Sequence, residues 1–117
     1  MFGFEKLEVW QLAIDYSDEI YATTRLFPND ERFGLTNQIR RASVSISSNI
    51  AEGSGRSSRK DFARFVEIAF GSLLETVSQF TIAKRQGFIE QPDFDRLYAA
   101  AERLGRMLSG LKNSLES

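Results

Sequence analysis

Cysteine and histidine are both absent from this chain of 117 residues. Their absence excludes disulfides, thiolate metal sites and nucleophile systems built on either residue. It also removes the side chain that most often acts as a general base near neutral pH. Carboxylate metal sites in helical bundles need a Glu-x-x-His motif, so Glu52, Glu67 and Glu75 are not expected to hold a metal. We therefore expect no metal, no cofactor and no enzymatic activity.

Proline and long apolar runs are also scarce. The chain has only 2 prolines, which is compatible with long helices. No apolar run approaches 18 residues, so no membrane-spanning helix is expected. The start, MFGFEKLEVW, has no basic segment followed by an apolar run and does not resemble a signal peptide. We expect a cytoplasmic protein with one domain over residues 1–117.

Apolar residues recur at helical spacing in four segments separated by turn residues. The predicted helices run from about Leu7 to Leu26, Leu35 to Glu52, Arg59 to Gln86, and from Pro92 onward. Short connections favour antiparallel neighbours, so the pattern predicts an all-α, up-down-up-down four-helix bundle. Gly53 and Gly55 are expected to form a left-handed cap after the second helix, and Gly87 ends the third. Phe33 is expected to anchor the first loop.

The apolar surface exceeds what one bundle would bury. The first helix carries a main stripe and a second stripe about 100–140° away from it, at 100° per residue. The third helix is apolar over roughly 200°, with Ile68 and Ile82 on its far side. The second helix has small residues around most of its circumference, which lets neighbouring backbones come close. These features predict a stable homo-oligomer.

Two long motifs stand in order in the middle of the chain. Residues 38–46 read QIRRASVSI and are followed by NIAEG at 49–53, and residues 68–75 read IAFGSLLE. With LEVWQ at 7–11 and FGL at 33–35, this pattern resembles the proteins encoded in intervening sequences of bacterial 23S rRNA genes. The resemblance implies a four-helix bundle, a homo-oligomer that is pentameric in known members, and no assigned enzymatic activity. A related branch, the accessory proteins of diversity-generating retroelements, is strongly basic and binds nucleic acid.

Charge is unevenly placed, although the formal net charge is only −1. Residues 1–33 sum to −4, residues 34–64 to +4 and residues 65–117 to −1. The basic middle segment yields four candidate nucleic-acid-binding residues, which are Arg56, Arg59, Lys60 and Arg64. It lacks a recognisable reading motif, so any binding is expected to be weak and independent of sequence. Four further residues are candidates for structural ion pairs within or between subunits: Arg40, Arg41, Glu52 and Glu75. The expected partner of Glu75 is Arg40 or Arg41.

The turn between the second and third helices offers two more motifs. The glycine loop at residues 53–56 precedes a helix N-terminus, where free amides can hold an anion, but no strand precedes it. Ser57 and Lys60 match the Ser-x-x-Lys tetrad of penicillin-recognising enzymes, without that family's partner motifs. We favour a helix cap and turn for both, with Ser58 and Asp61 forming a capping box.

The sequence thus supports three hypotheses of different class. The leading one is a non-enzymatic homo-oligomeric scaffold that resembles the rRNA intervening-sequence proteins. The second is a nucleic-acid-binding accessory protein like those of the retroelements; the basic segment favours it and the acidic total argues against strong binding. The third, a catalytic or ligand-binding bundle, is disfavoured by the missing histidine and cysteine.

Overall fold

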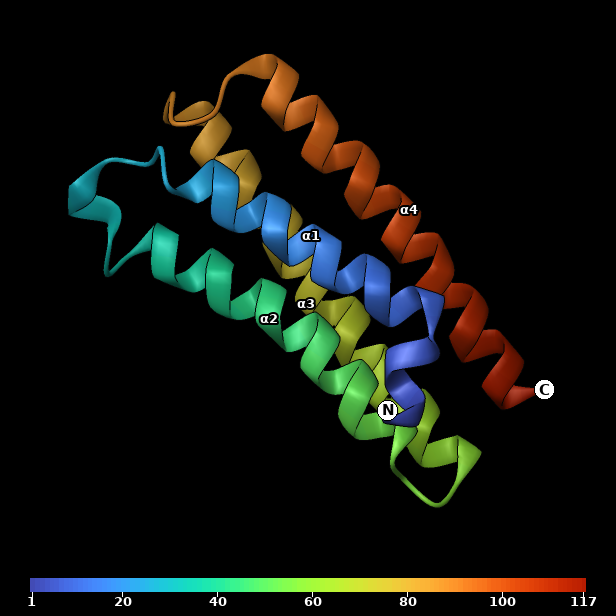
Figure 1. Cartoon of the computed structure of the whole chain (residues 1–117). Coiled ribbons are helices and arrows are strands. Elements are labelled where there is room, and N and C mark those ends of the chain that lie inside the picture. Colours follow the sequence, from blue (N-terminus) through green and yellow to red (C-terminus); the bar gives the residue numbers. More distant parts are fainter.

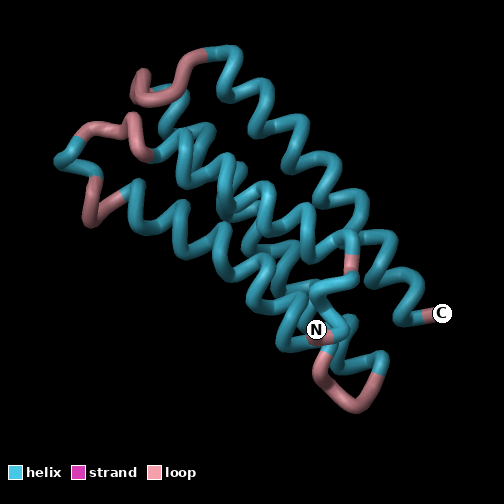
Figure 2. Tube along the Cα trace, in the orientation of Figure 1, coloured by secondary structure: helices cyan, strands magenta, loops and turns pink.

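A computed structural model describes residues 1–117 and shows four helices in an antiparallel bundle (Figure 1). The helices are α1 (Glu8–Thr24), α2 (Leu35–Ser54), α3 (Arg59–Arg85) and α4 (Gln91–Glu116), with short 3-10 turns η1 (Gly3–Lys6) and η2 (Asn29–Glu31). Short loops join them (Figure 2). Each helix packs on the next along the chain and α4 closes on α1, whereas in the diagonal pairs α1–α3 and α2–α4 no Cα atoms come within 8 Å of each other. The predicted all-α four-helix bundle is confirmed. None of its helices has the length and apolar character that crossing a membrane requires.

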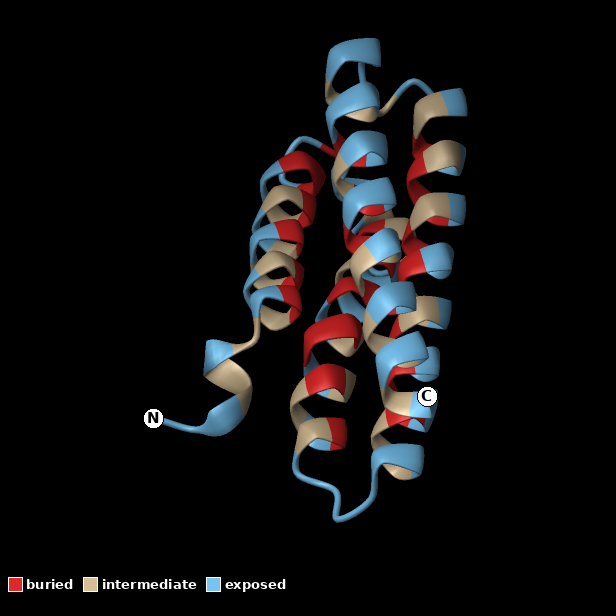
Figure 3. Ribbon diagram, turned by 90° about the vertical axis from the view of Figure 1, so that its right-hand side faces the viewer, coloured by how far each residue is buried: buried red, intermediate tan, exposed pale blue.

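The core follows the predicted stripes. Buried positions line the sides of the helices that face one another (Figure 3). The main stripe of α1 is buried at all six predicted positions: Val9, Ala13, Tyr16, Ile20, Thr24 and Phe27. Burial of the large apolar members, Val9, Ile20 and Phe27, stabilises the fold by roughly 1.5–3 kcal/mol each. The second stripe of α1, at Trp10, Ile14, Ser17 and Tyr21, is only half-buried, along the side next to α2.

Two helix ends form where predicted, although at the first of them the second bond of the predicted capping box, from the Ser58 amide to the Asp61 carboxylate, is absent. The Ser58 hydroxyl accepts a hydrogen bond from the Asp61 amide at 3.0 Å and caps the N-terminus of α3. At the other end Gly87 has φ of 81°, the only positive φ in the chain. The Phe88 amide there donates to the Ala83 carbonyl at 2.9 Å and the Gly87 amide to the Lys84 carbonyl at 3.1 Å. These two bonds define a Schellman motif, for which glycine is the favoured residue.

The predicted left-handed cap at Gly53 and Gly55 is wrong. Helix α2 continues through Gly53 to Ser54, and Gly55 has a right-handed φ of −87°. Gly53 is instead buried against α3, where a Cβ on it would lie 2.6 Å from the Phe65 Cβ. The glycine therefore permits a close helix crossing and does not supply a turn. The predicted anchor Phe33 is also wrong, because that side chain is 84% exposed.

One buried hydrogen bond links α1 to α3 across the core. The Tyr16 hydroxyl and the Thr76 hydroxyl lie 2.7 Å apart, and Thr76 also donates to the Leu73 carbonyl at 2.6 Å. Burial raises the pKa of Tyr16 to about 12, partly offset by the Thr76 hydrogen bond. Because the phenol ionises near 10 in an unfolded chain, stability that is present below pH 10 is lost as pH rises toward 12.

We expect Tyr16→Phe to lower the free energy of unfolding at pH 7 by about 1 kcal/mol, since Thr76 keeps its bond to Leu73 and is not orphaned. The variant should also lose less stability than the parent between pH 10 and 12. Urea unfolding at pH 7 and at pH 11 measures both effects. An identical alkaline loss in parent and variant would contradict the assignment of that loss to Tyr16.

Candidate nucleic-acid interface and apolar faces

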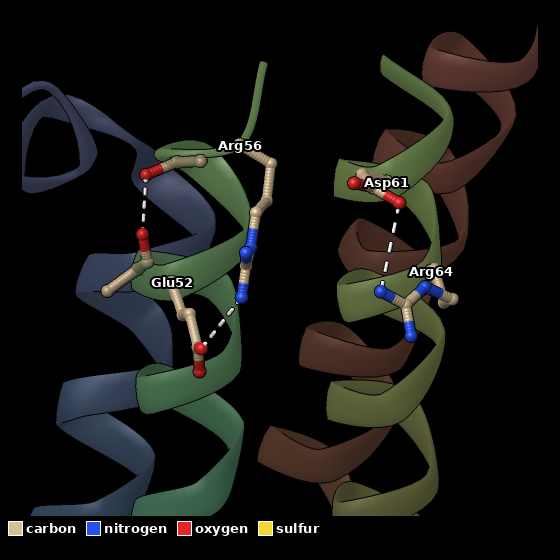
Figure 4. A network of polar contacts seen from close by, with 6 residues as sticks. Glu52, Arg56, Asp61 and Arg64 are labelled. Carbon is tan, nitrogen blue, oxygen red and sulfur yellow. Dashed lines mark hydrogen bonds and ion pairs between the residues drawn. The ribbon is translucent and has the colours of Figure 1, made fainter. Parts of the chain in front are cut away.

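The candidate nucleic-acid residues gather at the turn between α2 and α3, but most of them are engaged within the chain. The Arg56 guanidinium pairs with the Glu52 carboxylate at 3.0 Å, and Arg64 pairs with Asp61 at 3.7 Å (Figure 4). Both guanidinium groups also lie over the Phe65 ring, at 4.8 and 5.3 Å from its centroid. Their charges are therefore partly neutralised, and their planes rest on an aromatic face.

Arg59 and Lys60 open α3 beside the end of α4. The Arg59 guanidinium donates to the Ser114 carbonyl in the last turn of α4. A cation at a helix C-terminus interacts favourably with the unpaired carbonyls there, so Arg59 has a structural role. Lys60 is exposed and has neither a hydrogen bond nor an ion pair. Only one of the four candidates is thus a free cation. The groove of about 690 Å³ beside it is lined by Asp61, Glu67 and Glu116 as well as by basic residues, so it is not uniformly positive.

The candidate structural ion pairs form differently from the prediction. Glu52 is paired, with Arg56. The Arg40 Nε instead donates to the Thr24 hydroxyl at 2.8 Å, and its guanidinium lies 4.7 Å from the centroid of the Tyr21 ring. Arg40 therefore joins α2 to α1.

The predicted facing of Arg40 or Arg41 with Glu75 does not occur within one chain. The Glu75 carboxylate accepts a hydrogen bond from the Gln79 amide at 3.2 Å, and Arg41 is exposed with no ion pair. A pairing between subunits stays a prediction.

A further arginine ties α4 to α1 on the surface. Arg96 pairs with Asp93 at 2.7 Å and with Glu19 at 2.9 Å. These hydrogen bonds, that to Asp93 first, raise the pKa of Arg96 above its ordinary value. The group is well exposed, so solvent screens the pair and its contribution to stability is small. Sequence reasoning did not single out this arginine, because the separation of 77 residues between Glu19 and Arg96 carries no local signal.

The outer side of α3 presents an apolar surface, which we call the α3 face: Ile68, Gly71, Leu74 and Ile82. The three large side chains are 44%, 55% and 48% exposed, in that order. Beside Leu74 a groove of about 600 Å³ runs between α3 and α4, with half-buried Phe70 and Val77 among its lining residues. Ile68 and Ile82 were predicted to lie on the far side of the helix, and the structure agrees.

A second apolar surface lies along α1 and α2, and we call it the α1 face: Trp10, Ile14, Tyr21 and Val44. The α1 members are half-buried and Val44 is 43% exposed. A groove of about 590 Å³ there is lined by Ile14, Tyr21 and Val44, with Asp18 and Arg25 also among its lining residues. Sequence reasoning did not identify Val44 as part of an apolar surface. The available signal was a β-branched apolar residue flanked by the small residues Ser43 and Ser45.

The structure brings no three acidic side chains together in a way that could hold a metal ion. Two buried polar atoms, the Thr23 hydroxyl and the Gln79 amide oxygen, have no hydrogen-bond partner. They lie on different helices and do not form a site.

Comparison with known proteins places this bundle in a family. The family model described as 23S rRNA-intervening sequence protein matches residues 5–110. No curated protein matches the chain at a significant level. A solved structure from Bacteroides thetaiotaomicron, a protein of unknown function from the S23 ribosomal protein family, superposes with a TM-score of 0.82. It is 22% identical, and the match covers 89% of this chain and 97% of that one. The similarity of the structures concerns the fold alone, whereas the family match spans nearly the whole sequence, and this chain belongs to the 23S rRNA-intervening sequence protein family.

Proposed function

We propose that the protein is a non-enzymatic homo-oligomeric scaffold that acts in the cytoplasm. The observation that carries the proposal is the α3 face, where three large aliphatic side chains are each about half exposed. A single exposed aliphatic residue is ordinary, but several on one helix next to an apolar groove indicate a contact surface. Family resemblance suggests five subunits.

The half-buried second stripe of α1 supports the same proposal. Trp10, Ile14 and Tyr21 extend the apolar surface of α1 beyond the strip that the core uses. The four helices are fully accounted for in one bundle, so a further neighbour for this stripe must come from another molecule. A second, identical subunit can be that neighbour, because most oligomers form from copies of one chain.

Light scattering coupled to size-exclusion chromatography tests the oligomer. We expect a mass that is a small multiple of the chain mass of 13.3 kDa at micromolar concentration. The helical bundle should remain folded on dilution into the oligomer's dissociation range, as judged by circular dichroism. A single-chain mass at every concentration tested would remove this proposal.

A second candidate function is weak association with nucleic acid, favoured by the net charge of +4 over residues 34–64. Lys60 is the free cation at the α2–α3 turn, so Lys60→Glu is expected to weaken binding without loosening α4. Binding should fall steeply as salt rises, because phosphate contacts act through counterion release. A salt titration against single- and double-stranded RNA and DNA measures this, with Lys84→Glu, at the far end of α3, as the matched control. Tight, sequence-selective binding at high salt would contradict the proposal of weak binding through phosphate contacts.

A further inference from the structure

The groove between α3 and α4 has the size of a binding site for a small molecule. Its volume is about 600 Å³, within the range of roughly 300–1,000 Å³ that is usual for such sites. The α3 wall is apolar, with Phe70, Leu74 and Val77 in the lining, and the ring of Tyr98 on α4 continues it. A lining of this kind binds an apolar body because the contact removes apolar surface from water.

Two glycines keep the α4 wall of this groove free of side chains. Gly105 and Gly110 lie inside α4, where glycine is disfavoured relative to alanine. A Cβ on Gly110 would meet nothing within 4 Å, and one on Gly105 would make only ordinary contacts, the nearest at 3.4 Å from the Leu73 Cδ2. Packing within the chain therefore requires neither glycine. Their missing side chains leave room above the apolar wall.

A cation and two further polar side chains gather in one half of the groove. Arg106, Ser109 and Asn113 follow one another on one face of α4, at spacings of three and four residues, and all three line the groove. Each is exposed, and none of the three side chains has an ion pair or a hydrogen bond in the chain. Tyr98 lies in the other half, roughly 12 Å from Arg106 along the helix axis. The groove is thus apolar in one half and offers free hydrogen-bond donors in the other.

The one acid in the lining stands apart from these donors. Glu102 is exposed and has no ion pair, and it lies roughly 10 Å along the helix axis from Ser109. A negative group held between Arg106 and Asn113 gains charge-assisted hydrogen bonds and stays away from Glu102. A positive group in the same place would face the guanidinium of Arg106. The charges of the groove therefore favour an anion.

We infer that this groove binds an amphiphilic anion, a molecule with an apolar body and one carboxylate head group. The body lies against Phe70, Val77 and Tyr98, and the head group accepts hydrogen bonds from Arg106 and Asn113. The inference goes beyond the proposed scaffold, because it gives every subunit a ligand site. Of the groove residues only Leu74 belongs to the α3 face, so the site lies along the edge of the proposed subunit contact and does not require it.

Calorimetric titration with decanoate tests the site, because decanoate combines an unbranched apolar chain with a single carboxylate. One molecule is expected to bind per chain, at concentrations below those at which decanoate forms micelles. Decyltrimethylammonium, a probe with a similar chain and the opposite charge, should bind about tenfold more weakly, since it lacks the charged hydrogen bonds. Failure of decanoate to bind, or equal affinity for the two probes, would overturn the inference.

A matched pair of arginine variants locates the head group. Arg106→Glu should weaken decanoate binding by about tenfold, because an acid replaces the charged donor. Arg103→Glu is the control and should bind as the parent does. Arg103 is an exposed arginine of the same helix without an ion pair, but it lines the groove between α1 and α4. Parent-like affinity in Arg106→Glu would refute the assignment of the head group.

Filling the groove tests where the apolar body lies. Gly105→Leu should abolish decanoate binding, and the bundle is expected to stay folded because the new Cβ makes only ordinary contacts. Circular dichroism checks the fold, and if this variant is unfolded, Gly110→Leu replaces it. Undiminished binding by the folded variant would place decanoate elsewhere and overturn the inference. The mass of the parent is measured separately, so the ligand site and the proposed oligomer can fail independently.

Discussion

Gly53→Ala is expected to lower the free energy of unfolding by about 1–3 kcal/mol, although the same change in most helix interiors is stabilising. The new Cβ would lie 2.6 Å from the Phe65 Cβ and 3.0 Å from the Phe62 Cδ1. The Phe65 Cβ is bonded directly to the backbone and cannot move away by a side-chain rotation, so α2 and α3 must separate. Their separation would also disturb Arg56, whose guanidinium rests on the Phe65 ring.

Gly110→Ala is the matched control for this prediction. Gly110 also lies inside a helix, α4, but a Cβ on it would meet nothing within 4 Å. The substitution should therefore stabilise the chain by about 0.5–1 kcal/mol through helix propensity alone. Urea unfolding of both variants gives the two values. Opposite signs are expected, and a stabilised Gly53→Ala would mean that the helix crossing is looser than the structure shows.

The outcome at Gly53 illustrates what could be predicted from the sequence. Periodicity predicted the buried stripes because burial repeats with the helical turn, and every main-stripe position of α1 is indeed buried. Glycine has two uses, a left-handed turn and a close approach, and local sequence does not separate them. Gly87 takes the first use and Gly53 the second. The distinction depends on where Phe65 of the next helix lies.

The roles of the arginines were less predictable for the same kind of reason. The i,i+4 spacing of Glu52 and Arg56 was a usable local signal for their pairing. Arg59 reaches a carbonyl 55 residues away, and Arg40 reaches α1 in place of Glu75. A long flexible side chain selects its partner from whatever the fold brings near, so composition showed a basic segment but not how much of its charge is free.

Phe80→Ala is expected to cost about 3–5 kcal/mol in the free energy of unfolding, as large truncations in packed cores do. Phe80 is fully buried on α3, and its ring meets the Phe94 ring of α4 edge to face at 5.4 Å between centroids. Removing it leaves a cavity between the two helices that their packing cannot close without a shift. Phe33→Ala, at an 84% exposed position, is the control and should change stability by less than about 0.5 kcal/mol.

The same substitution connects the core with the groove beside the α3 face, which is the proposed contact surface. The centroid of the Phe94 ring lies 6.0 Å from that of the Tyr98 ring, and Tyr98 lines the groove between α3 and α4. A cavity at Phe80 lets Phe94 move inward, and Tyr98 loses the ring that supports it. We therefore expect Phe80→Ala to weaken self-association as well as folding, even at concentrations of denaturant where the bundle is intact. Sedimentation of the folded variant measures this, and a parent-like mass at every concentration would show that the groove is independent of the core behind it.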